Sequence, residues 1–176
     1  DNILTRAHRF IHVGGITAKS TDPRYAIFKA QLAYQAGNAD KAWRGYRENR
    51  QLVTNTYKDL DLDFMTWLIK RHTQFGEFDS AESLARTLIR FVDSGEAHFE
   101  PDQRGKLLLA YANIALARQE YPRARAQYER IAATPVFEAT RIGHRAEIKI
   151  AEIDRVTRNY AEATERLERL SENPDP

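Results

Sequence analysis

The 176-residue sequence predicts an all-α protein built from repeated antiparallel helical hairpins, and three observations support this prediction. Apolar residues recur three and four positions apart, which is the period of a helix and not the alternation of a strand. Only 8 Gly and 6 Pro interrupt stretches rich in Ala, Leu, Arg and Glu, residues that favour helices. A short turn pattern also returns four times. Together these features predict nine helices and no sheet.

The first half of the chain carries clear signals for where helices begin and end. A first helix is expected over residues 1–15, ending at Gly14-Gly15. Asp22-Pro23 then provides an N-cap followed by a proline at the first helical position. Gly37 closes the helix that follows, and Asp40 is expected to cap the next one. These signals predict one helix and then a helical hairpin.

The second half continues in the same way. Residues 61–75 form an expected helix with one apolar stripe, and Gly76 ends it. The next helix is expected to end at Gly95, and another spans residues 104–118. Tyr121-Pro122 starts a further helix, because proline lacks only an N–H that would be unpaired there. The stripe of the 61–75 helix consists of Phe64, Leu68, Ile69 and His72.

Internal repetition is the strongest signal in the sequence. The aligned segments are Gly37-Asn-Ala-Asp-Lys-Ala42, Gly76-Glu-Phe-Asp-Ser-Ala81, Gln119-Glu-Tyr-Pro-Arg-Ala124 and Arg158-Asn-Tyr-Ala-Glu-Ala163. Each is a turn that ends in an alanine inside the next helix. Only a small side chain fits where two antiparallel helices cross closely, which explains the alanine.

These residues resemble the tetratricopeptide repeat, a helix-turn-helix unit with small residues at the helix crossing. The resemblance implies a right-handed superhelical solenoid that covers the whole chain as one array. Its expected parts are a half unit at 1–15 and units at about 22–58, 61–99, 102–134 and 138–172. The repeat alanines lie 39, 43 and 39 residues apart, more than the family's 34. We expect the chain to be a segment of a longer protein.

Composition excludes several classes of function. The chain has no Cys, so disulfide scaffolds, thiolate zinc sites and cysteine nucleophiles are excluded. Its formal net charge is +2, which does not favour a nucleic-acid-binding protein. No apolar run approaches the length of a membrane span. The sequence predicts no cofactor.

Candidate chemical sites are weak, so we expect neither an enzyme nor a metal site. His8 and His12 lie four apart on an expected helix, but no third ligand is evident. Asp59, Asp61 and Asp63 imitate a calcium loop, yet its glycine and bidentate glutamate positions hold other residues. A helix N-terminus explains these acids better. The acids at 165 and 168 alternate with Arg166 and Arg169, which is typical of a solvated helix face.

The resemblance places a concave binding surface on the first helix of each unit. Its polar positions in this sequence are Arg24, Gln31, Tyr34, Gln35, Lys70, Gln74, Lys106, Asn113, Arg145, Glu152 and Arg155. Apolar positions, among them Leu109 and Ile148, lie between them. This mixture suits hydrogen bonding to an extended or helical peptide. Asn113 matches only part of the family's clamp for a terminal carboxylate.

The sequence therefore predicts a non-catalytic scaffold that binds a peptide or protein in the concave groove. We expect it to belong to a larger bacterial protein, in an envelope or exopolysaccharide-export assembly, with the periplasm favoured over the cytoplasm. One alternative is a sensor or regulatory domain of a transcriptional or signalling protein. A second is an RNA-binding helical-repeat module, for which the row of Arg44, Arg47 and Arg50 is the candidate contact.

Overall fold

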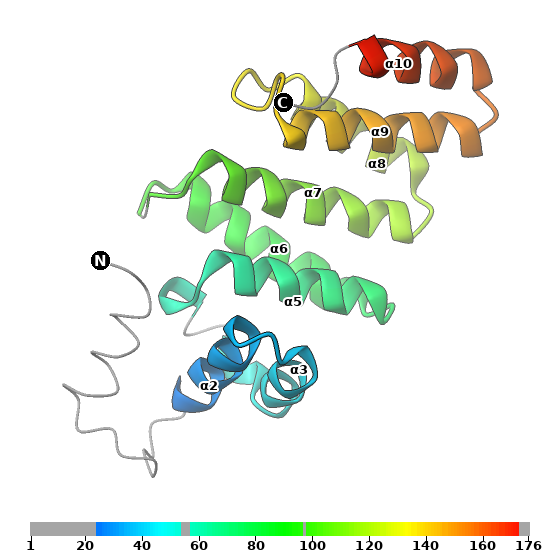
Figure 1. Cartoon of the computed structure of the whole chain (residues 1–176). Coiled ribbons are helices and arrows are strands. Elements are labelled where there is room, and N and C mark those ends of the chain that lie inside the picture. The colour runs from blue at the N-terminus through cyan, green and yellow to red at the C-terminus, as the bar shows by residue number, and fades with distance from the viewer. Residues whose placement is uncertain (1–23, 54–56, 97, 173–176) are drawn as a thin grey trace. The chain divides into compact units, whose positions relative to one another are not determined.

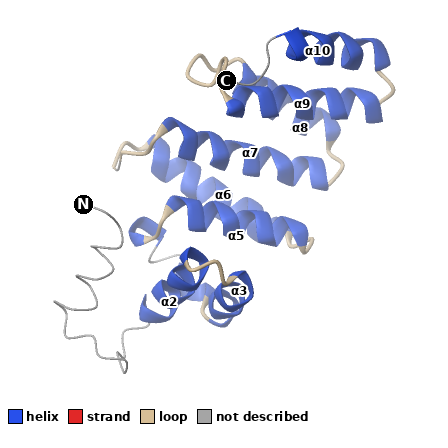
Figure 2. Cartoon of the chain, viewed as in Figure 1, coloured by secondary structure: helices blue, strands red, loops and turns tan. Residues whose placement is uncertain are grey.

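The computed structural model describes residues 24–53, 57–96 and 98–172, which contain eight α-helices (Figure 1). The helices are α2 (Arg24–Gln35), α3 (Ala39–Glu48), α5 (Leu62–Gln74), α6 (Phe78–Asp93), α7 (Pro101–Ala117), α8 (Tyr121–Ala132), α9 (Arg141–Val156) and α10 (Tyr160–Glu172), with 3₁₀ turns η1 (Arg50–Leu52) and η2 (Tyr57–Asp59). The described ranges contain no strand (Figure 2), so the all-α prediction is confirmed. The expected helix over 1–15, with His8 and His12, and the Asp22-Pro23 cap lie outside the described residues.

The chain divides into two compact units, Asp1–Met65 and Thr66–Pro176. In the first unit, α2 and α3 pack closely. The distance shows at Gly45 of α3, where an added methyl group would lie only 3.3 Å from Cβ of Ala30 in α2. Asp61 caps α5, and its carboxylate accepts hydrogen bonds from the backbone N–H of Asp63 at 2.8 Å and of Phe64 at 3.1 Å. The acidic run at 59–63 therefore lies at a helix N-terminus, as expected from the sequence, and Asp61 is its cap.

The N-cap of α3 differs from the expected one. The helix begins at Ala39, and the side chain of Asn38 accepts a hydrogen bond from the backbone N–H of Lys41 at 3.1 Å. Asp40 is therefore not the cap, and that prediction is wrong. It lies in the first helical turn, where its negative charge interacts favourably with the helix dipole.

The four aligned turns share one backbone conformation. Their first residues, Gly37, Gly76, Gln119 and Arg158, have φ angles of 77°, 72°, 61° and 68°. In each turn this residue and the next donate N–H bonds back to the preceding helix. In the second turn, the N–H of Gly76 donates to the carbonyl of Thr73 at 3.1 Å, and the N–H of Glu77 donates to the carbonyl of His72 at 2.9 Å. This is the Schellman motif, which satisfies carbonyl groups at a helix end.

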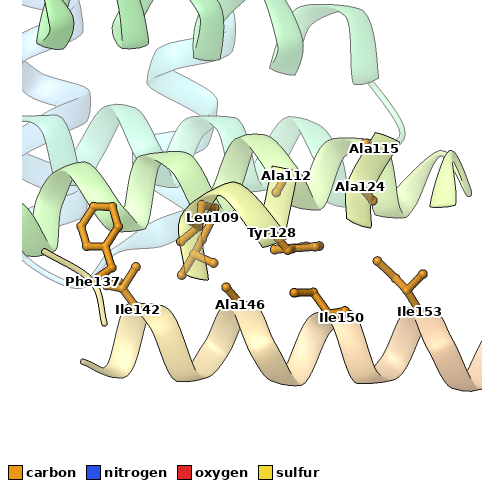
Figure 3. Close-up of a cluster of buried hydrophobic side chains, with 11 residues drawn as sticks. Leu109, Ala112, Ala115, Ala124, Tyr128, Phe137, Ile142, Ala146, Ile150 and Ile153 are labelled. Carbon is orange, nitrogen blue, oxygen red and sulfur yellow. The ribbon is translucent and has the colours of Figure 1, made fainter. Parts of the chain in front are cut away.

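The core of the Thr66–Pro176 unit lies between successive helices. The helices α6 to α10 each pack against the next one, and α7 also contacts α9. A cluster of buried apolar side chains joins α7, α8 and α9, and one side of α9 contributes Ile142, Ala146, Ile150 and Ile153 to it (Figure 3). This row faces Leu109 of α7 and Tyr128 of α8 (Figure 3). The α9–α10 hairpin is thus held on the α7–α8 hairpin by a continuous apolar contact.

The repeat alanines are buried, which leads to a first prediction. Ala124 is 0 % exposed in the crossing of α8 with its neighbours. Changing Ala124→Leu should overpack this contact and reduce the free energy of unfolding by about 1–3 kcal/mol, as measured by urea denaturation. Ala126→Leu is the matched control, because Ala126 is exposed on the same helix. Equal unfolding midpoints for both variants would contradict the assigned crossing.

Candidate protein-interaction surface

The surface positions expected on α2 divide into exposed and buried residues. Arg24 and Gln35 are exposed, and Tyr34 is half-buried with its ring centroid 5.5 Å from that of Phe64. Gln31 is only 2 % exposed. Its side-chain oxygen accepts a hydrogen bond at 2.8 Å from the backbone N–H of the residue that caps α5. Gln31 therefore positions the start of α5 and does not present its amide to a partner.

The expected positions on α5 and α7 also differ from one another. Lys70 and Gln74 are exposed on α5, whereas Lys106 of α7 is half-buried and forms an ion pair of 2.6 Å with an aspartate one turn earlier. Asn113 of α7 accepts a 2.6 Å hydrogen bond from the hydroxyl of Tyr128. Burial raises the pKa of Tyr128, and Glu152 raises it further, so the hydroxyl keeps the proton that it donates. Asn113 is thus held against the neighbouring helix.

The expected positions on α9 lie together on one accessible side. Arg145, Ile148 and Arg155 are exposed, and Glu152 lies between them and accepts a 2.7 Å bond from Lys149. Their spacing places them on one stripe of the helix. A hollow beside the first turns of this stripe is lined by Arg141, His144, Arg145, Ile148 and Leu170. The stripe of α9 therefore adjoins the last turn of α10.

In the α7–α8 hairpin, residues at the corresponding positions are covered within the unit. Leu109, Tyr128 and Ile131 are 7 %, 0 % and 4 % exposed, because the inner side of α9 covers them. Tyr121, at the start of α8, packs against the same cluster. The predicted surface position Leu109 is thus part of the contact between two hairpins, and it does not line an open groove.

The α9–α10 hairpin repeats this arrangement 39 residues later but leaves it uncovered. The counterparts of Leu109, Tyr128, Ile131 and Tyr121 are Ile148, Leu167, Leu170 and Tyr160. Ile148, Leu167 and Tyr160 are 42 %, 49 % and 60 % exposed, and Leu170 is half-buried. We call these four residues, together with Arg145, Glu152 and Arg155, the open face. Sequence reasoning missed its α10 half, although the alignment of Leu167 with Tyr128 was a usable signal.

No family model, curated protein or solved structure matches this chain. Within the described ranges, no three His, Cys, Asp or Glu side chains are grouped so that they could hold a metal ion. The part of the chain that the structure describes also contains no helix with the length and apolarity of a membrane span.

A polar cluster centred on Glu82 joins α6 to α8. The carboxylate accepts a 2.8 Å bond from Arg86 and a bond from Arg123, and Arg123 also donates to the hydroxyl of Tyr111 at 3.3 Å. Burial raises the pKa of Glu82, but the hydrogen bonds and charges of Arg123 and Arg86 outweigh burial and lower it. A carboxylate held ionised in this way is a structural ion-pair partner and is unsuited to general acid catalysis at neutral pH.

The lowered pKa of Glu82 predicts a pH-dependent contribution to stability. A folded pKa below the ordinary 4.5 stabilises the fold above that pH, and this stabilisation is lost as the pH falls through the folded pKa. Glu82→Gln should therefore reduce the free energy of unfolding by about 1–2 kcal/mol at pH 7. The difference from the unsubstituted chain should shrink on acidification below pH 4.5. Glu165→Gln is the control, because Glu165 is exposed. A loss of unfolding free energy in Glu82→Gln that does not change with pH would contradict this assignment.

A second polar cluster joins α8, α9 and α10. Asp154 of α9 is 0 % exposed, and its carboxylate accepts a hydrogen bond from Arg125 of α8. Arg166 of α10 binds Glu147, and its Nε lies 3.8 Å from the other oxygen of Asp154. The expectation of a uniformly solvated charged face on α10 is wrong at Arg166, whose side chain is only 17 % exposed. The cluster fixes α10 against the rest of the unit, behind the open face.

Proposed function

We propose that this chain is a non-catalytic protein-interaction module, built as a tetratricopeptide-like right-handed array of helical hairpins. Four turns with the same Schellman geometry support the repeat, as do the buried alanines that follow them. The contact between α7 and α9 also supports it, because the first helices of successive hairpins touch in such arrays. The polar clusters around Glu82 and Asp154 hold helices together, which accords with a scaffold role.

The open face carries the proposal. Six large apolar side chains are exposed among the described residues, and four of them, Ile148, Val156, Tyr160 and Leu167, lie on α9 or α10. Grouped apolar exposure with a polar rim is typical of protein-binding surfaces. In the α7–α8 hairpin, the residues at the corresponding positions pack against the helix α9. The same backbone geometry therefore supports the binding of a helix at the open face. The partner class is therefore a protein that presents an apolar helical surface.

Site-specific photocrosslinking in cells tests this proposal. A photoreactive amino acid replaces Arg155 on the open face, and in a matched control it replaces Arg130, which is exposed on α8. We expect protein adducts from position 155 only, and their loss when Leu167→Glu is added to the same chain. Equal adducts from both positions would contradict the proposal. Recovery of nucleic acid that falls steeply with salt would support the RNA-binding alternative instead.

A further inference from the structure

Arg166 of α10 lies between two acids of α9. Its Nη1 donates to the carboxylate of Glu147, and its Nε lies 3.8 Å from Oδ2 of Asp154. The two acids are about two turns apart on α9, so they lie on one stripe of that helix. The side chain of Glu147 is 30 % exposed, whereas that of Asp154 is 0 % exposed. One guanidinium group therefore lies beside an outer acid that solvent reaches and an inner acid that solvent does not reach.

The contact of Arg166 with the inner acid is incomplete. Oδ2 of Asp154 and Nε of Arg166 are both buried, and neither atom has a hydrogen-bond partner among the described residues. The other oxygen of Asp154 accepts a hydrogen bond from Arg125 of α8. Because a carboxylate can accept from two arginines, Oδ2 retains the capacity to bind Arg166. Buried polar groups are nearly always paired, and leaving a charged group unpaired costs the most free energy.

The shape of the guanidinium group explains why only one of the two contacts is complete. Its nitrogen atoms are fixed in one plane. While Nη1 donates to Glu147, the distance from Nε to Oδ2 of Asp154 is roughly 1 Å longer than a charged hydrogen bond. A small rotation of the side chain would complete the inner bond and lengthen the outer one. The charges around the inner position permit this move, because Arg125 also keeps Glu129 at 2.8 Å from its Nε.

We propose that Arg166 is a two-position latch, which exchanges between Glu147 and Asp154 and keeps α10 attached to α9 in both positions. Among the described residues of α10 only Ala163 is buried, so the ion pairs of Arg166 matter for the attachment of this helix. Dissolved salt screens the attraction of the exposed Glu147 and has much less effect on the buried Asp154. Raised salt therefore moves Arg166 to the inner acid and does not release α10. This inference goes beyond the proposed function, because it concerns how α10 is retained.

Exchange of the Nε–H proton of Arg166 with water, measured by ¹⁵N NMR, tests the latch. In Glu147→Ala this proton should exchange at least about tenfold more slowly than in the unsubstituted chain, because it enters a charge-assisted hydrogen bond with Asp154. Raised salt should slow the same proton in the unsubstituted chain. Arg169, which is exposed on the same helix, is the internal control, and its Nε–H proton should exchange at one rate in both chains.

A second substitution tests whether Asp154 is the inner position. In Glu147→Ala/Asp154→Asn the slowing should be lost, and the amide protons of α10 should exchange faster than the two single effects combined predict. Glu147→Ala/Glu168→Ala is the matched control, since it removes an exposed acid of α10 and should keep the slow exchange. Slowing that persists without the carboxylate of Asp154 would overturn the inner position. An Nε–H proton that exchanges as fast in Glu147→Ala as in the unsubstituted chain would overturn the latch, and this comparison does not require the double variant to fold.

Discussion

Gly143→Ala is expected to reduce the free energy of unfolding by about 2–3 kcal/mol. A methyl group at this position would lie 2.4 Å from the backbone oxygen of Phe137 and 3.2 Å from its carbonyl carbon. That carbonyl cannot move aside easily, because it accepts the backbone N–H of Thr140 at 3.1 Å and its hydroxyl at 2.7 Å. Phe137 is itself 2 % exposed in the apolar cluster. The intrinsic helix preference of alanine over glycine, about 1 kcal/mol, offsets only part of this overlap.

Urea denaturation of Gly143→Ala measures the effect, with Gly45→Ala as the matched control. A methyl group at Gly45 would approach Cβ of Ala30 to 3.3 Å, a contact that a small shift of α3 relieves. The control should therefore change stability by less than about 1 kcal/mol. Equal stability of Gly143→Ala and the unsubstituted chain would show that the loop before α9 is not held against the helix in this way.

Asp154→Ala is expected to destabilise the chain by about 2–4 kcal/mol. The substitution leaves two arginines, Arg125 and Arg166, without the buried carboxylate between them. Each keeps one other acid, since Glu129 lies 2.8 Å from Nε of Arg125 and Glu147 binds Arg166, and this limits the loss. The fold should fail first at α10, because the cluster links that helix to α8 and α9.

Denaturation of a matched set of variants tests the Asp154 cluster. Asp154→Asn keeps the shape and removes the charge, so it should fold and lose less stability than Asp154→Ala. Glu129→Ala removes a partly exposed acid and should change stability by less than about 1 kcal/mol. If Asp154→Ala is no worse than Glu129→Ala, the carboxylate does not hold the three helices together.

Much of the helical framework could be predicted because its signals are local. Apolar spacing placed Phe64, Leu68 and Ile69 on one stripe, and all three are 0 % exposed. The turns at Gln119 and Arg158 have no glycine to mark their positive φ, so only alignment with the glycine turns indicated them. Alignment of the repeats therefore located two turns that no glycine marks in the sequence.

The parts that could not be predicted depend on neighbours distant in the sequence. Gly143 and Asp154 look ordinary within α9, and only the preceding loop and the flanking helices give them their roles. Gln31 was expected at a surface, but its amide is buried against the start of α5. Arg145, Glu152 and Arg155 do lie together on α9. The second half of the open face was missed because the resemblance places the binding surface on the first helix of each unit.

The limited burial of α10 sets the order in which the unit opens. Among its described residues only Ala163 is buried, whereas α7 contributes seven buried residues and is covered by α6, α8 and α9. Amide hydrogens of α10 should therefore exchange with solvent through local detachment of that helix, and those of α7 only through global unfolding. A partner protein bound to the open face would close this route, so the lifetime of the native state would increase with the concentration of that partner.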